Sequence, residues 1–156
     1  MPSNAIARIK SAPKRVSGVA IITATLLFVA VVAVPRHASG SRQVRLGSQI
    51  FTLEVANTPA QQTKGLGDRT NLAPRHGMLF TFDQAAVQCF WMKDMHFSID
   101  IIWLDSQERI GYIQSDVSPA TYPHTFCPAV TARSVIELPA GQAQRLGLRI
   151  GQQLHF

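Results

Sequence analysis

The first 40 residues of this 156-residue chain contain no acidic side chain, although they hold five basic ones, Arg8, Lys10, Lys14, Arg15 and Arg36. Charged residues are few overall, at 15%, and apolar residues make up 46%, which excludes an intrinsically disordered chain. Residues 41–156 keep 10 basic and 9 acidic side chains, so they contribute only +1 to the net charge of +6. The basic pI near 10 therefore comes mainly from the residues before the domain, and we expect no nucleic-acid partner.

The sequence also lacks the short motifs that identify common reactions. It contains no P-loop, no GxGxxG fingerprint, no CxxC pair, no HExxH helix and no internal repeat. We therefore expect no cofactor. A chain of this length is sufficient for one domain of ordinary size.

One long apolar run is present, at residues 16–34 (VSGVAIITATLLFVAVVAV). As a helix, this run would span about 28 Å, close to the hydrocarbon thickness of a bilayer. A cleaved signal peptide is the alternative, but the run is longer than a usual h-region and the small-x-small cleavage pattern is poor. We predict an uncleaved signal anchor that lies in the lipid bilayer.

The basic residues before this run predict its orientation, because positively charged N-terminal stretches stay in the cytoplasm. We therefore expect a cytoplasmic N-terminus at residues 1–15, a transmembrane helix at 16–34 and a polar tether at 35–41. We expect residues 42–156 to form the domain outside the cytoplasm of a single-pass protein of the cell membrane.

Strand patterns dominate this domain. Residues 43–46 and 49–56 flank Gly47-Ser48, which suits a two-residue hairpin turn. Thr58 before Pro59 starts a short helix that ends before Gly65, and a second short helix is expected at 142–146. Further strands are predicted at 78–82, 87–92, 99–104, 109–113 and 132–138, and residues 152–156 close the chain. The pattern predicts a mainly β domain, a compact antiparallel β-sandwich or barrel with two short helices.

Four blocks occur in an order that resembles the domain-of-unknown-function 192 family: EVANTPAQQTKGL, HGMLFTF, FWMKDMHFSIDIIWLD and VIELPAGQAQRLGLRIG. Members of this family are small domains, often secreted or membrane-anchored, in bacteria and archaea. The resemblance implies a compact β-sandwich-like fold and no established activity. This chain has Gly67-Asp68 where the family commonly has a large apolar or aromatic pair, and Asp94-Met95 where it often has Asn-Thr. A role that depends on that amide or hydroxyl cannot be carried over.

The candidate catalytic residues are Asp94, His96, Asp100 and Glu137. A histidine with carboxylates at short range can bind a metal or act as an acid/base set. The alternative is structural, with Asp94 in a turn, His96 in solvent and Asp100 bonded to backbone near a bend. Because no second His or Cys has ligand-like spacing, we predict no metal site.

Asp100 and Glu137 each interrupt an apolar strand, where an unpaired charge is costly. An ion pair with Lys93, Arg69 or Arg133 would explain either residue, and so would a paired-carboxylate catalytic site. We favour the ion pair, because such pairs are common outside active sites.

The candidate binding residues are Trp91, Lys93 and His124. An exposed Trp beside a lysine and acids would suit stacking against a sugar ring or a peptide, and core packing is the alternative. His124 lies in a proline-containing loop that could border a pocket. Trp103, within an apolar run, is expected in the core.

Cys89 and Cys127 are the two cysteines of the chain. In an exported domain, a single pair is most simply a disulfide. Two buried thiols, or Cys89 acting as a nucleophile beside His124 or His96, are the alternatives.

These features predict a membrane-anchored binding or scaffolding module of the cell envelope, which recognises a polymer or a protein. The alternative is a hydrolase-type enzyme that uses the Asp/His/Glu cluster, with or without a metal. A purely structural role in an envelope complex is the third interpretation.

Overall fold

The computed structural model describes residues 40–155. The predicted cytoplasmic N-terminus, the transmembrane helix and most of the tether lie outside these residues. Within residues 40–155, no helix combines the length and the apolar character needed to cross a bilayer.

The described residues form eight strands, two α-helices and one 3-10 helix. The strands are β1 (Ser41–Leu46), β2 (Gln49–Ala56), β3 (His76–Ala86), β4 (Phe90–Trp91), β5 (Ile99–Leu104), β6 (Ile110–Val117), β7 (Thr125–Phe126) and β8 (Ala132–Pro139). The helices are α1 (Pro59–Lys64), α2 (Gln142–Arg145) and the 3-10 helix η1 (Pro119–Thr121).

Six of the strands form one mixed sheet in the order β1-β2-β3-β8-β5-β6. All neighbouring pairs are antiparallel except β2 and β3, which are parallel and are joined by α1 and a long loop. β4 and β7 form a separate two-stranded ribbon. The prediction of a mainly β domain with two short helices is confirmed. The prediction of an antiparallel sandwich or barrel is wrong in two respects. The sheet is mixed, because β2 and β3 are parallel, and it does not close into a barrel, because β1 and β6 remain its edges in the described residues.

Local turn and cap chemistry explains the elements that match the prediction best. Gly47 takes a φ of +57° in the β1–β2 turn. The Thr58 side chain accepts a hydrogen bond from the Gln61 N–H, and the Gln61 side chain accepts one from the Thr58 N–H. These two bonds form a capping box at the start of α1. Strand β5 has the predicted bounds. The strand predicted at 87–92 is wrong in length, because a turn at Lys93 and Asp94 ends it and only Phe90–Trp91 pairs with β7.

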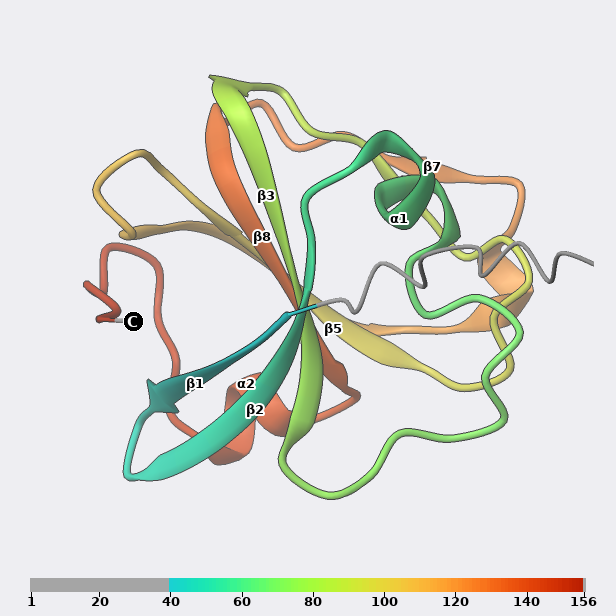
Figure 1. The fold of residues 1–156 in the computed structure, drawn as a ribbon, viewed down its shortest axis with the longest axis horizontal. Coiled ribbons are helices and arrows are strands. Elements are labelled where there is room, and N and C mark those ends of the chain that lie inside the picture. Colours follow the sequence, from blue (N-terminus) through green and yellow to red (C-terminus); the bar gives the residue numbers. More distant parts are fainter. Residues whose placement is uncertain (1–39, 156) are drawn as a thin grey trace, which may run out of the picture. The chain divides into compact units, whose positions relative to one another are not determined.

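The two faces of the sheet carry separate apolar clusters. The first includes Phe51, Leu79, Ile136 and Leu138 with Ala143 of α2. The second lies on the other face and is covered by the loop after α1, the segment before β5 and the β4–β7 ribbon; it includes Met78, Phe80, Ile101, Trp103 and Val135. Figure 1 shows this division, with α2 on one side of the sheet and α1 and β7 on the other.

Gly77 lies where β3 packs closely against both neighbouring strands. A Cβ atom at this position would lie 2.5 Å from the Glu137 carbonyl oxygen and 2.7 Å from Leu53 Cδ2. The first of these atoms belongs to the backbone of the adjacent strand and cannot move without disturbing the ladder. We expect Gly77→Ala to lower the free energy of unfolding by about 2–3 kcal/mol, measured by urea denaturation.

Gly111 in β6 provides the matched control. A Cβ atom there would meet Val130 Cβ at 3.7 Å, an ordinary contact. Gly111→Ala should therefore change the stability by less than about 1 kcal/mol. Equal losses in the two variants would show that close strand packing does not select the glycine at position 77.

Candidate pocket and its buried glutamate

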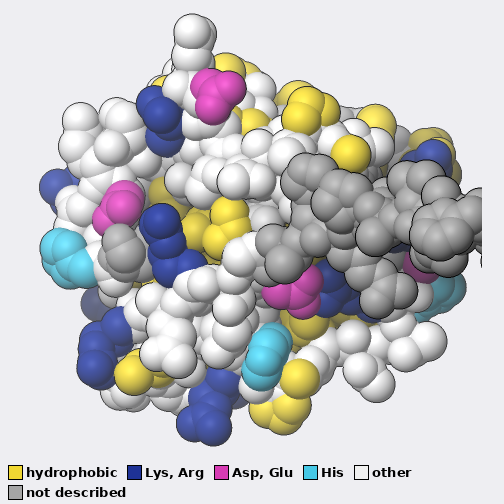
Figure 2. Space-filling view, viewed as in Figure 1, with side chains coloured by type: hydrophobic (Ala, Val, Ile, Leu, Met, Phe, Trp, Pro, Cys, Tyr) yellow, Lys and Arg dark blue, Asp and Glu magenta, His cyan; other side chains and the backbone are white. Residues whose placement is uncertain are grey.

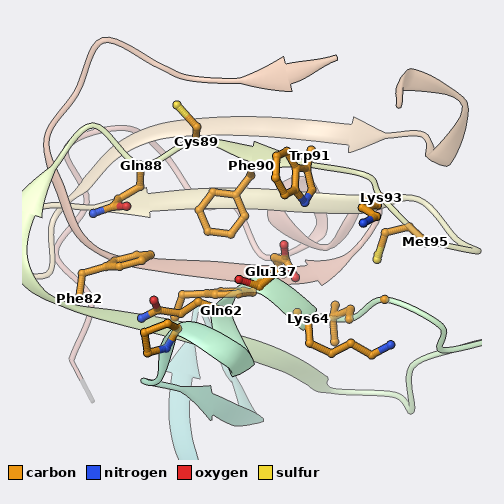
Figure 3. A pocket seen from close by; sticks show the side chains of 16 residues that line it. Gln62, Lys64, Phe82, Gln88, Cys89, Phe90, Trp91, Lys93, Met95 and Glu137 are labelled. Carbon is orange, nitrogen blue, oxygen red and sulfur yellow. The ribbon is translucent and has the colours of Figure 1, made fainter. Parts of the chain in front are cut away.

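A pocket of about 270 Å³ lies between α1 with its following loop and the segment that enters β4. Its floor is the sheet face that carries the second apolar cluster, and β8 contributes Glu137 to it (Figure 3). The lining residues are Pro59, Gln62, Thr63, Lys64, Gly65, Leu66, Gly67, Phe80, Phe82, Gln88, Cys89, Phe90, Trp91, Lys93, Met95 and Glu137. The pocket thus combines aromatic walls, amide and lysine side chains, and one carboxyl group.

Glu137 is the most unusual residue of the pocket. It is only 5% exposed, and in the described residues its Oε2 atom has no hydrogen-bond partner. It pairs across the ladder with Met78 of β3 and Ile101 of β5, so both strand neighbours are apolar. Burial raises the pKa of Glu137 to about 8, although the positive charge of Arg69 opposes that rise. At neutral pH the side chain is therefore mainly a neutral carboxylic acid, able to donate and to accept a hydrogen bond.

Arg69 does not neutralise Glu137 directly. Its guanidinium donates two hydrogen bonds to Glu54, from Nη1 to Oε1 at 2.6 Å and from Nη2 to Oε2 at 2.8 Å. The hydrogen bonds from Arg69 hold the pKa of Glu54 below its ordinary value. The ion pair expected between Arg69 and Glu137 is therefore absent, and Arg69 pairs with Glu54 instead.

The wall opposite α1 is held by three kinds of contact. Cys89 and Cys127 form a disulfide, which confirms that prediction, and their Cα atoms are 4.4 Å apart. Phe90 packs edge-on against Phe80, with ring centroids 4.9 Å apart, and against Trp103 at 5.8 Å. The buried Trp103 also donates from Nε1 to the Gln88 carbonyl oxygen at 2.8 Å. A covalent bond, aromatic packing and a hydrogen bond together fix the segment that presents the Trp91 side chain.

The mouth of the pocket is polar and partly aromatic. Trp91 is 50% exposed, and two exposed lysines also line the pocket, Lys93 on the same wall as Trp91 and Lys64 on the opposite wall. Lys64 also pairs with Asp68 in the turn that follows α1, and its hydrogen bond lowers the pKa of Asp68. In Figure 3, Phe90, Trp91 and Lys93 lie across the pocket from Gln62 and Lys64, with Glu137 between them.

Two loops meet beside this mouth. The Asp68 N–H donates to the Asp94 carbonyl oxygen at 2.7 Å, and a Cβ atom on Gly67 would lie 3.0 Å from the Lys64 carbonyl oxygen. Asp94 takes a φ of +59° in the turn that follows β4. The departures from the family pattern at Gly67-Asp68 and at Asp94-Met95 thus lie opposite each other, at one place in the structure.

Asp100 lies on the opposite face of the sheet from Glu137. Asp100 is paired with Leu138, and Glu137 with Ile101, so the alternation of side chains places the two carboxyl groups on different faces. The Asp100 carboxylate accepts hydrogen bonds from the N–H groups of Asp116 (2.9 Å), Gly141 (3.0 Å) and Ala143 (2.7 Å). It thereby caps α2 from a neighbouring strand, because Gly141 at the N-cap has no side chain to do so.

The other candidate residues are spread around the pocket. Trp91 and Lys93 line it, whereas Asp94 borders an adjoining depression with Lys64 and Lys93. His96 is exposed, and exposed His124 packs edge-on against Phe126. In residues 40–155, no three His, Cys, Asp or Glu side chains are grouped as metal ligands.

Several pocket residues were not predicted. Gln62 and Lys64 come from α1, and Gln62 Nε2 donates to the Thr81 carbonyl oxygen at 2.9 Å, which ties the helix to β3. Phe80 and Phe82 occupy alternate positions of β3. That alternation was the one available signal for an aromatic face, but the sequence does not show that α1 folds over it.

The fold and the pocket define a small mixed-sheet domain with one pocket-facing, buried carboxylic acid. The chain belongs to the domain-of-unknown-function 192 family (DUF192, "Uncharacterized ACR"), which matches residues 42–156. No curated protein matches the sequence.

Two solved structures are similar to this chain. One is from Sinorhizobium meliloti 1021, a protein that has been suggested to be a transcription regulator, with a TM-score of 0.72 and 30% identity over 76% of this chain and 95% of that one. The other is a protein of unknown function from Novosphingobium aromaticivorans DSM 12444, with a TM-score of 0.66 and 29% identity over 74% of this chain and 84% of that one.

Proposed function

We propose that residues 42–156 form a binding domain of the cell envelope, held at the membrane by residues 16–34, whose pocket recognises an envelope polymer. The observation that supports it best is a ring-sized pocket with the half-exposed Trp91 at its mouth and Glu137 at its floor. An aromatic face at the mouth and a hydrogen-bonding group below it are typical of sites that hold one unit of a chain.

The disulfide agrees with a place outside the cytoplasm, since such bonds persist in oxidising compartments. The distribution of charge argues against a nucleic-acid partner. On the face drawn in Figure 2, basic and acidic side chains are interspersed. A phosphate backbone would instead require a basic stripe.

The alternative is a hydrolase that uses the Asp/His/Glu cluster. A buried carboxylic acid with a raised pKa is suited to act as a general acid, which favours this reading. Glycoside hydrolysis commonly uses a second carboxyl group on the other side of the scissile bond. Among the described lining residues, Glu137 is the only carboxyl group, and Asp100 lies behind the sheet. The binding function therefore has more support.

Trp91→Ala tests this proposal. Loss of an aromatic stacking surface typically costs about 2 kcal/mol, so retention on the polymer should weaken by about tenfold or more. The assay is co-sedimentation of the full-length protein, in a polyoxyethylene detergent, with a bacterial envelope fraction freed of lipid and protein. Tyr122→Ala is the matched control, because Tyr122 is 49% exposed and does not line the pocket.

Equal retention of Trp91→Ala and wild type would refute the pocket as the binding site. Retention on the untreated envelope fraction that is absent on the fraction freed of protein would instead identify a protein partner and would refute the polymer.

A further inference from the structure

We infer that the pocket takes one anionic pyranose unit, a sugar ring that bears a carboxylate or phosphate group. This inference rests on the proposed function and specifies its ligand. Four observations support it: the volume of the pocket, the unpartnered oxygen at its floor, its aromatic walls and the two lysines at its mouth.

The volume of the pocket suits a single ring. Pockets for drug-sized ligands measure roughly 300–1,000 Å³. The present pocket, at about 270 Å³, lies just below that range. It therefore suits one sugar unit rather than a folded peptide segment.

The floor of the pocket favours a hydroxyl-bearing ligand. Glu137 Oε2 is buried and lacks a hydrogen-bond partner in the described residues, and such an atom is costly to leave unsatisfied. A ligand hydroxyl can both donate to and accept from a carboxyl group, whichever way the carboxyl proton points. Burial favours the neutral form of Glu137, which does not repel an anionic ligand.

The walls suit the faces of a pyranose ring. Phe82, Phe90 and Trp91 line the pocket together with Met95, and Figure 3 shows Phe90 and Trp91 above Glu137. A pyranose has C–H groups on its faces and hydroxyls around its edge. It can therefore pack against aromatic rings while its hydroxyls reach Glu137, Gln62 and Gln88.

The mouth favours a negative charge. Lys64 and Lys93 both line the pocket and are exposed, and Glu137 is the only acidic side chain among its described lining residues. Asp68 offsets part of the charge of Lys64, so Lys93 is the residue we expect to select the anion. Exposed lysines add selectivity more than affinity, and the preference should therefore be about five- to tenfold.

The test is a titration of the full-length protein, in a polyoxyethylene detergent, followed by the indole N–H signals of Trp91 and Trp103 in ¹H–¹⁵N NMR spectra. The probes are methyl glucuronide, glucose 6-phosphate and neutral methyl glucoside. At least one anionic sugar should shift the Trp91 signal saturably with a Kd of about 1–10 mM, and methyl glucoside should bind about five- to tenfold more weakly.

Two variants distinguish recognition of the anionic group from recognition of the sugar ring. Lys93→Met should bind the anionic sugar about as weakly as methyl glucoside, and its affinity for methyl glucoside should equal that of the wild type. Arg149→Met, at an exposed residue outside the pocket, should keep the preference. Equal binding of charged and neutral sugars by wild type, or an unchanged preference in Lys93→Met, would overturn the inference.

Absence of saturable binding of either anionic sugar at about 50 mM would overturn it as well. If Trp91-dependent retention on the envelope polymer persists in that case, only the anionic pyranose is refuted and the proposed function stands. If retention does not depend on Trp91, the proposed function itself fails.

Discussion

Glu137→Gln is expected to abolish most of the loss of stability that the wild-type protein shows as the pH rises from about 5 to about 9. The pKa of Glu137 is raised from 4.5 to about 8 by burial. Between these values the native state holds a proton that the unfolded state has released. The stabilisation linked to that proton is complete below the unfolded pKa and is lost as the pH rises through the native pKa.

The effect is large on the scale of a domain's stability. At about 1.4 kcal/mol for each pH unit, the loss between pH 5 and pH 8 is at most about 4 kcal/mol. Glutamine has nearly the same shape and cannot ionise. The free energy of unfolding of the Glu137→Gln variant should therefore match that of the wild type within about 1 kcal/mol at pH 5 and exceed it at pH 9. Urea denaturation of the oxidised protein at these two pH values measures the difference.

Glu54→Gln is the control for this experiment. Hydrogen bonds from Arg69 lower the pKa of Glu54, so its contribution is present above the unfolded pKa and is lost as the pH falls. Removal of Glu54 should leave the slope between pH 5 and pH 9 unchanged. A wild-type stability that is flat over this interval would contradict a carboxyl group that is buried and protonated in the native state.

Asp100→Ala should have the second large effect, a loss of about 5 kcal/mol in the free energy of unfolding. The carboxylate accepts three backbone N–H groups, and the alanine would leave the Ala143 N–H buried without an acceptor. Asp100→Asn keeps one oxygen for the Asp116 and Gly141 N–H groups, since both bind Oδ1. It should therefore cost only about 2 kcal/mol. Thermal and urea unfolding give both values.

Asp105→Ala is the matched control, because Asp105 also accepts two backbone N–H groups, from Gln107 and Arg109, both at 2.9 Å. These bonds lie in an exposed hairpin turn, where water can replace the carboxylate. The expected cost is about 1 kcal/mol or less. Similar losses for Asp100→Ala and Asp105→Ala would show that burial of the Asp100 cap does not stabilise α2 and the adjoining turns.

The elements that the sequence predicted well are those with local causes. Thr58, Pro59 and Gln61 form their cap within one turn, and Gly65 ends the helix immediately afterwards. The turn at Gly47 needs only a positive φ. Strand β5 is buried along its whole length and is bounded by a turn, so that its apolar run is sufficient to define it.

Predictions that depended on contacts between residues far apart in the sequence were less accurate. The sequence showed two carboxyl groups in apolar strands but not which face each would occupy, because that depends on the register between β5 and β8. Arg69 was one of three possible partners for Glu137, and its pairing with Glu54 follows from the position of the loop after α1. The parallel pairing of β2 and β3 likewise follows from the path of that loop and not from either strand.

By itself, the sequence determined the β-rich class, the short helices and the family, because these depend on residue spacing within short segments. It also predicted the Cys89–Cys127 disulfide, since the chain has no other cysteine pair. Only the tertiary structure decided that Asp100 is a structural cap and that Glu137 is the floor of a pocket. The two carboxyl groups have similar strand neighbours, and what distinguishes them is the atoms that the fold brings to each: three N–H donors for Asp100 and apolar walls for Glu137.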